Sequence, residues 1–178
     1  MGKHRLIPHP DSICTAVTGI EVDIVLSAPG GVDLRYVVTG RMDEIDFPSV
    51  IDRGLTYELW RHTCFEMFSR TVGAERYDEL NLSPSSQWVS FGFASYRSDR
   101  GVLCSVPPDI VSRIEADRYE LRAFGVLSER GPWRIGLSAV IEEKSGRKSY
   151  WALAHPPGAP DFHHEDCFAL ELPAAGTP

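Results

Sequence analysis

The stretch that decides the fold runs from residue 59 to 96 and contains three strand-like runs, LWRHTCFEMF (59–68), YDELNLSPSSQW (77–88) and FGFASY (91–96). The run Cys64–Phe68 is mostly apolar without alternation, which predicts a central strand buried on both faces. Residues 79–82 read as a short strand closed by the turn 83–86, and residues 88–96 alternate large and small side chains. Strands so close together along the chain predict an antiparallel sheet.

The same period of two extends to both ends of the chain. Residues 20–26 and 34–38 alternate around a Pro-Gly-Gly turn and predict a hairpin. Further strands are predicted over 119–127, 133–142, 149–154 and 167–172, whereas 110–116 fits a strand or a helical turn. Residues 41–54 have no clear period and predict a loop.

Short strands with Gly/Pro turns predict an all-β fold, an antiparallel β-sandwich of two sheets like immunoglobulin or jelly-roll domains. Helix is expected only as one or two short turns, near Tyr57 and at Ile110. We expect one domain over residues 1–172, with 173–178 as a disordered tail. The predicted core residues are Phe91, Phe93, Leu137, Val140, Phe168 and Leu170.

Composition restricts the partners. The formal net charge is −7, and no run of four basic residues is present, which argues against nucleic acid and against an anionic membrane surface as partners. No stretch approaches the apolar length of a membrane-spanning helix, and the N-terminus MGKHRLIPHPDS lacks the apolar run of a signal peptide. The four cysteines are far apart, so we expect reduced thiols and a cytoplasmic location.

Several motifs together resemble a known family. They are Leu59-Trp60, Cys64-x-Glu66-x-Phe68, Tyr77-x-Glu79-Leu80-Asn81-x-Ser83-Pro84, and the late segments YWALAHP (150–156) and PDFHH (160–164). Over roughly positions 20 to 172 the chain resembles the DOMON-like proteins, which are related to family 9 carbohydrate-binding modules, and in particular a bacterial branch of small stand-alone members. The resemblance implies an antiparallel β-sandwich that binds a sugar or haem on one concave face.

Four residues in or beside strands are candidates for a sugar site. Sugars stack on flat aromatic rings while a few polar groups bind their hydroxyls. Trp60 and Trp151 are candidate platforms, and each could instead be a core residue. Glu66 lies among Phe65, Met67 and Phe68, so its carboxylate needs a partner, either a ligand or Arg61 or Arg70. We include Arg61 in the predicted site, and Asn81 is expected to serve a turn.

The late loop is dense in histidine and aspartate. His155, His163 and His164 could donate hydrogen bonds to a ligand, could bind a divalent metal together with Asp161 and Asp166, or could be solvated residues of a rigid loop. A metal site is not predicted, because no paired spacing of histidines or cysteines supplies four ligands.

Other functions stay open. Haem would need an axial pair such as Met67 with His62 or His155, whereas a methionine in an apolar strand typically fills the core. Acid–base catalysis by His155, His163 and Glu66 is a further alternative, as is a metal-dependent enzyme or a protein-interaction role. No nucleophile motif is present. The leading hypothesis is a non-catalytic module, without a cofactor, that binds a carbohydrate-like metabolite.

Overall fold

The computed structural model describes residues 2–27, 30–103, 106–127 and 131–174, and in these residues β-strands dominate. The strands are β1 (Gly2–Pro8), β2 (Val17–Ser27), β3 (Gly31–Gly40), β4 (Gly54–Leu55), β5 (Cys64–Thr71), β6 (Tyr77–Leu82), β7 (Gln87–Phe93), β8 (Gly101–Val102), β9 (Asp109–Ile114), β10 (Arg118–Val126), β11 (Trp133–Glu142), β12 (Lys148–Ala152) and β13 (Leu170–Leu172). The helical elements of the described residues are short 3₁₀ turns, η1 (Met42–Glu44), η2 (Leu59–Arg61) and η3 (Glu165–Cys167).

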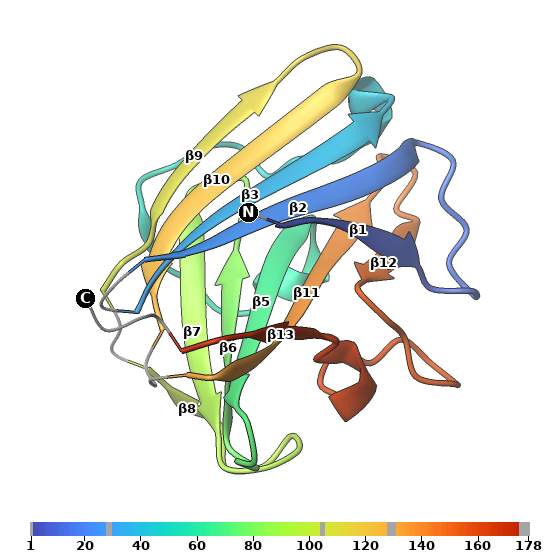
Figure 1. Cartoon of the computed structure of the whole chain (residues 1–178). Helices are drawn as coiled ribbons and strands as arrows, with labels where there is room; N and C mark the ends of the chain where they lie inside the picture. Colours follow the sequence, from blue (N-terminus) through green and yellow to red (C-terminus); the bar gives the residue numbers. More distant parts are fainter. Residues whose placement is uncertain (1, 28–29, 104–105, 128–130, 175–178) are drawn as a thin grey trace.

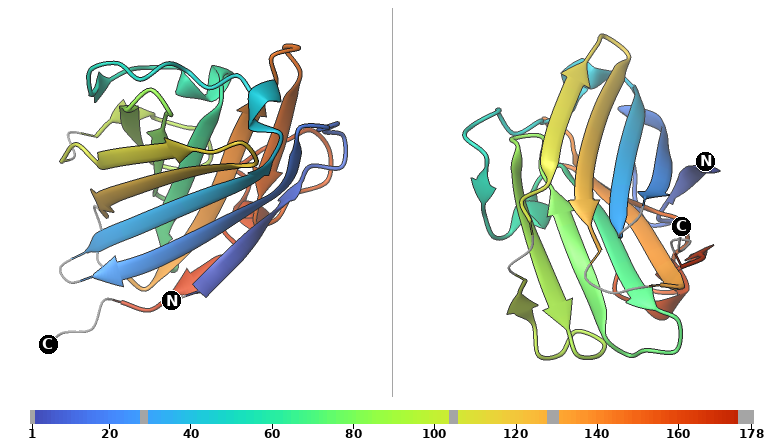
Figure 2. Two further views of the ribbon diagram at one scale, coloured as in Figure 1. Left: turned by 90° about the horizontal axis from the view of Figure 1, so that it is seen from above. Right: turned by 60° about the vertical axis from the view of Figure 1, so that its left-hand side comes forward.

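The strands form one continuous sheet in the order β4-β7-β6-β5-β11-β12-β1-β2-β3-β10-β9, with β13 added to β11 and β8 to β7. Neighbouring strands are antiparallel except for β4 and β7. The sheet curls, so that a first half-sheet (β1, β2, β3, β10 and β9) stands opposite a second half-sheet (β12, β11, β5, β6, β7 and β4), as Figures 1 and 2 show.

The prediction of an all-β fold with little helix is confirmed. A separation into two sheets is not confirmed, because β1 pairs with β2 along one edge and with β12 at its end, which joins the two halves. The predicted hairpin is β2 and β3. The ambiguous segment near Ile110 is strand β9 and not a helical turn, and the N-terminal strand β1 was not predicted.

The main core lies between the inner faces of the two half-sheets. Phe65 of β5 packs against Tyr36 of β3, with ring centroids 5.1 Å apart, and stacks nearly parallel to Tyr119 of β10 at 5.8 Å. The Tyr36 hydroxyl donates a hydrogen bond of 2.7 Å to the backbone carbonyl of Glu66. These contacts hold the two halves together across the core.

A second apolar cluster lies on the outer face of the second half-sheet. Along β5 the side chains alternate, so that Phe65 and Met67 enter the main core whereas Cys64 and Phe68 join this outer cluster. β5 is therefore buried on both faces, as its apolar run predicts. Of the predicted core residues, all are buried except Leu170, which is partly buried.

The outer cluster is covered by the segment between β12 and β13, residues 153–169, which we call the closing loop. Its η3 turn packs closely on β11, where a Cβ atom at Gly136 would lie 3.1 Å from the Cys167 carbonyl oxygen. Glycine at this position therefore permits the loop to approach the strand. Figure 1 shows the loop in red beside β11 and β5.

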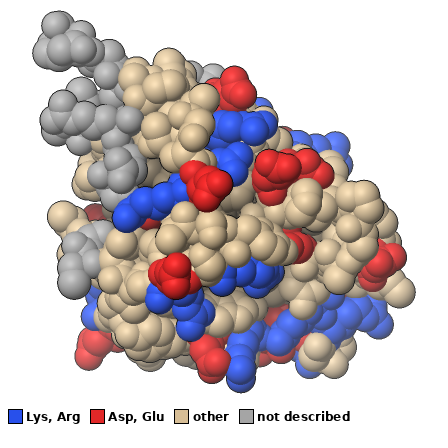
Figure 3. Space-filling model, turned by 90° about the horizontal axis from the view of Figure 1, so that it is seen from below, with Lys and Arg blue, Asp and Glu red and all other residues tan. Residues whose placement is uncertain are grey.

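No helix of the described residues is long and apolar enough to cross a membrane. Cys14, Cys64 and Cys167 are free thiols, whereas Cys104 and residues 175–178 of the predicted tail lie outside the described residues. On the face of the molecule in Figure 3, basic and acidic side chains are interspersed.

Candidate ligand-binding site

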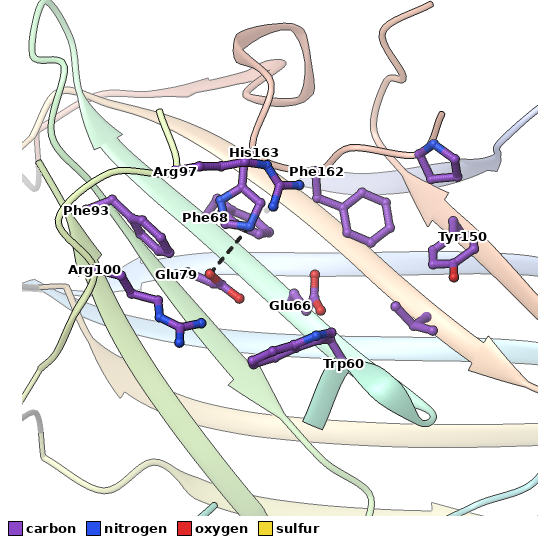
Figure 4. Close-up of a pocket in the computed structure, with 12 residues that line it drawn as sticks. Trp60, Glu66, Phe68, Glu79, Phe93, Arg97, Arg100, Tyr150, Phe162 and His163 are labelled. Atoms are coloured by element: carbon purple, nitrogen blue, oxygen red, sulfur yellow. Dashed lines mark ion pairs between the residues drawn. The ribbon is translucent and has the colours of Figure 1, made fainter. Parts of the chain in front are cut away.

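A cavity of about 380 Å³ lies between the outer face of the second half-sheet and the closing loop. Strands β5, β6, β7, β11 and β12 supply its floor and walls, and η2, the loop 94–100 and the closing loop surround it (Figure 4). It is lined by Trp60, Glu66, Phe68, Glu79, Phe93, Arg97, Arg100, Val140, Tyr150, Pro160, Phe162 and His163.

Glu66 is a buried acid that faces this cavity from β5. Its Oε2 accepts a hydrogen bond of 3.1 Å from the Ser138 hydroxyl on the neighbouring strand β11. Burial, and secondly the nearby negative charge of Glu79, raise the pKa of Glu66 to about 8. Glu66 is therefore mostly protonated at neutral pH. Neither Arg61 nor Arg70, the partners considered from the sequence, pairs with it: Arg61 pairs with Glu58 and Arg70 lies over Phe168.

Glu79 is the second buried acid and reaches the cavity from β6. Its Oε1 accepts a hydrogen bond of 2.7 Å from the Asn81 side-chain amide. Asn81 is buried within β6 and supports this carboxylate, which corrects its predicted role in a turn. Burial raises the pKa of Glu79, while the Asn81 hydrogen bond and the charges of Arg100 and Arg97 act in the opposite direction.

His163 closes the cavity from the loop side. Its Nδ1 lies 2.8 Å from the Tyr77 hydroxyl, and its ring packs edge-on to Phe68 and Phe93, each with centroids 5.1 Å apart. Burial, followed by the charge of Arg97, lowers the pKa of His163 to about 4. The 3.8 Å contact from its Nε2 to Glu79, dashed in Figure 4, is therefore between a neutral imidazole and a carboxyl group at neutral pH, and not a charged pair.

An ion pair ties the closing loop to the loop 94–100. Arg97 Nη2 lies 2.7 Å from Asp161 Oδ1, and the Tyr96 hydroxyl donates to Asp161 Oδ2. Asp161 Oδ1 also accepts a 3.0 Å hydrogen bond from the backbone N–H of His163. We call this group the Asp161 clasp. Because Asp161 holds the backbone of His163, the clasp fixes the imidazole at the cavity wall.

Aromatic rings form the remaining walls. Trp60 is only partly buried and lies edge-on to Phe91, with centroids 6.2 Å apart. The Arg100 guanidinium lies 4.7 Å from the centroid of Phe91 and 6.0 Å from that of Trp60, and has no ion pair with another described residue. The cavity therefore combines flat apolar surfaces, buried carboxyl groups and a guanidinium, a combination suited to a small ligand with several polar groups.

The structure brings together three of the predicted site residues, Trp60, Glu66 and His163. Trp151 requires a correction: it is 4% exposed, belongs to the main core on the inner face of β12, and its indole N–H donates to Ser149 Oγ at 2.9 Å. A stacking platform must expose one ring face, so this tryptophan is a core residue.

Arg61, His155 and His164 also lie outside the cavity. Arg61 is exposed and forms a 2.8 Å ion pair with Glu58. His155 uses its Nε2 to contact the Ile7 carbonyl oxygen at 2.9 Å, which ties the loop to β1. His164 precedes η3, where its Nδ1 accepts from the Asp166 backbone N–H at 3.3 Å, and it lines a neighbouring hollow that it shares with His163.

Sequence reasoning missed Glu79, Arg97, Arg100, Tyr150 and Phe162. Glu79 belongs to a motif quoted from the sequence, but only the register of β5 and β6 shows that its side chain shares a face with Glu66. Arg97 and Arg100 lie in a loop without a periodic pattern.

The residue pairs considered for haem do not meet. Met67 is buried in the main core, whereas His62 is exposed and its Nδ1 contacts Glu142 at 2.7 Å. No group of three or more His, Cys, Asp or Glu side chains within the described ranges is arranged to hold a metal ion.

No protein-family model matches the chain, and no curated protein matches its sequence. Solved structures do share its fold. One is a Bacteroides uniformis protein described as a "putative carbohydrate-binding protein", with a TM-score of 0.62 and 13% identity over 93% of this chain and 83% of that one. Another is a family 9 carbohydrate-binding module from Caldicellulosiruptor kristjanssonii in complex with cellotriose, with a TM-score of 0.51 and 12% identity over 87% of this chain and 74% of that one. At these identities the likeness establishes the fold.

Proposed function

We propose that this protein is a non-catalytic module that binds a small carbohydrate in the cavity beneath the closing loop. The observation that carries the proposal is the partly exposed ring of Trp60 beside two buried carboxyl groups, Glu66 and Glu79. Pyranose rings have an apolar C–H face and a rim of hydroxyls, so a flat aromatic surface next to fixed hydrogen-bonding groups matches both parts of a sugar.

The polar groups of the cavity would bind the sugar hydroxyls. Glu79 is an acceptor held in place by Asn81, Arg100 is a donor, and His163 is held by Tyr77. Since Glu79 and His163 are already held by these contacts, little of their side-chain entropy would be lost on binding.

The size of the cavity favours a small ligand. At about 380 Å³ it falls near the lower end of ligand pockets, which range over roughly 300–1,000 Å³. The closing loop covers it on one side, so an internal segment of a long polysaccharide would not fit. We therefore propose that the ligand is a mono- or disaccharide, such as a cytoplasmic sugar metabolite.

The fold neighbours add support of a weaker kind. Both were described as carbohydrate-binding proteins, and one was solved with cellotriose. Because a shared fold does not fix a function, the proposal depends on the cavity and not on this likeness.

A panel of neutral and charged mono- and disaccharides, screened by thermal shift and followed by calorimetry, tests the proposal. A ligand that binds the folded state raises the melting temperature according to its concentration and affinity. Trp60→Ala should abolish the shift. Tyr57→Ala is the matched control, because Tyr57 is an exposed neighbour of Phe91 that does not line the cavity. Equal binding by both variants would contradict the proposal.

A further inference from the structure

Glu66 is a buried acid without a cationic partner among the described residues. It is 2% exposed, and among the described residues its carboxyl group accepts a hydrogen bond from the Ser138 hydroxyl. The basic residues nearest in sequence are used elsewhere, since Arg61 pairs with Glu58 and Arg70 lies 5.0 Å from the centroid of Phe168. A buried carboxylate without a compensating cation is costly, so the cavity offers an ion-pairing position that the described side chains leave open.

The positive charges of the cavity are concentrated at its other end. Arg97 and Arg100 both act on the pKa of Glu79, whereas the pKa of Glu66 responds to burial, to the charge of Glu79 and to Ser138. In Figure 4, Arg100 lies on the side of Glu79 away from Glu66. Arg97 is also paired with Asp161 at 2.7 Å. Among the described residues, the Glu66 end of the cavity thus contains an acid without a base.

Aromatic rings surround that end. Trp60, Tyr150 and Phe162 line the cavity on the Glu66 side, as Figure 4 shows. The faces of aromatic rings attract cations, and the attraction grows when the cation is removed from water. A carboxyl group with aromatic walls is therefore a suitable site for an ammonium group, whereas a second carboxylate would be repelled there.

We infer that the preferred ligand is an amino sugar, whose protonated amine lies against Glu66 while its ring stacks on Trp60 and its hydroxyls reach Glu79 and Arg100. This inference rests on the proposed carbohydrate binding and names the class of sugar. The rival class is an acidic sugar held by the exposed Arg100, and the experiment separates the two.

The test is isothermal calorimetry at pH 6.5 with matched pairs of sugars. The pairs are glucosamine with glucose, galactosamine with galactose, and mannosamine with mannose, and glucuronate and N-acetylglucosamine are added as anionic and uncharged comparisons. In at least one pair the amino sugar should bind about tenfold or more tightly than its neutral partner, as expected for one partly buried ion pair. Glu66→Gln keeps the shape of the side chain and an acceptor for Ser138, and should reduce the ratio of the amino-sugar affinity to the neutral-sugar affinity to about twofold.

A second measurement uses the unmodified protein and does not depend on the folding of the variant. Titrations in two buffers of different ionisation enthalpy should show release of up to one proton when the amine binds, because Glu66 gives up its proton to pair with the ammonium. Neutral sugars should release none.

The outcomes are distinct. Neutral sugars binding as tightly as their amino partners, or glucuronate binding best, would overturn the inference and leave the carbohydrate proposal standing. A preference for amino sugars that persists in Glu66→Gln would also overturn it. If no member of any pair binds, the carbohydrate proposal itself fails, and the inference fails with it.

Discussion

Glu66 and Glu79 lie diagonally across the paired strands β5 and β6, because Glu66 is opposite Asn81 and Glu79 is opposite Phe68. Both side chains therefore share one face, and both reach the same cavity. Two carboxyl groups so placed hinder each other's ionisation, which adds to the effect of burial on Glu66.

The raised pKa of Glu66 predicts that this residue destabilises the fold as pH increases. Its pKa is about 8 in the folded protein against 4.5 for an unperturbed glutamate, so the folded state holds the additional proton between these limits. The contribution of Glu66 to the free energy of unfolding is therefore fully present below about pH 4.5. It decreases as pH rises toward 8 and stays constant above that pH. Urea denaturation of the wild type and of Glu66→Gln should show the variant gaining relative stability over this window, by up to about 1.4 kcal/mol per pH unit. A difference independent of pH would contradict the assignment.

Trp151 should be a stability residue without a binding role. Trp151→Ala leaves a hole in the main core, and truncation of a buried aromatic residue costs about 3–5 kcal/mol of unfolding free energy. Chemical denaturation measures this loss, and calorimetry should give an unchanged sugar affinity for the folded fraction. Weakened binding with the stability retained would instead make Trp151 a platform.

Glu120 should stabilise the first half-sheet through its arginines. Its carboxylate contacts Arg35 at 2.7 Å, Arg122 at 2.7 Å and Arg118 at 2.9 Å, and these lower its pKa to about 2. The folded pKa is depressed, so the contribution is present above about pH 4.5 and is lost as pH falls toward 2.

Glu120→Gln should therefore lose about 1 kcal/mol of unfolding free energy at pH 7 and less in high salt. Glu115→Gln is the control, since Glu115 forms an exposed pair with Arg113 and should change little. An equal effect of the two variants would show that the network contributes nothing beyond one surface pair.

The Asp161 clasp should affect binding more than stability. Asp161→Asn removes the charge that pairs with Arg97 and the second acceptor used by Tyr96, so the closing loop and His163 would be held less firmly. We expect sugar affinity to fall several-fold, as is typical when a preorganised group becomes mobile. Asp166→Asn, in the same loop but at an exposed position beside His164, should bind normally. Calorimetry with the sugar of the panel that binds most tightly measures the affinity of both variants.

Much of the fold could be predicted from the sequence because strand periodicity is a local property. The continuous apolar run of β5 correctly indicated burial on both faces, and the alternation in β2 and β3 correctly indicated a hairpin. The strand β1 was missed because its residues are mostly polar, and the ambiguous segment β9 became a strand by pairing with β10.

The site was harder to predict because it depends on register and on loops. Trp60 and Trp151 look alike in sequence, but Trp60 lies in η2 at the cavity whereas Trp151 occupies an inner-face position of β12. A shift of one residue in a strand would exchange the two faces, and this is decided by pairing over the whole sheet. Arg97 and Arg100 are positioned by tertiary contacts, and a local sequence pattern does not predict such contacts.

Sugar binding measured on the wild type and on Trp60→Ala tests the central claim most directly. Calorimetric titration with the paired neutral and amino sugars should give saturable binding at one site in the wild type. In Trp60→Ala, affinity should fall by at least about tenfold with little change in melting temperature, because Trp60 is partly exposed and its ring would be the stacking surface. Absence of binding by the wild type to every sugar, or undiminished binding by Trp60→Ala, would contradict the account.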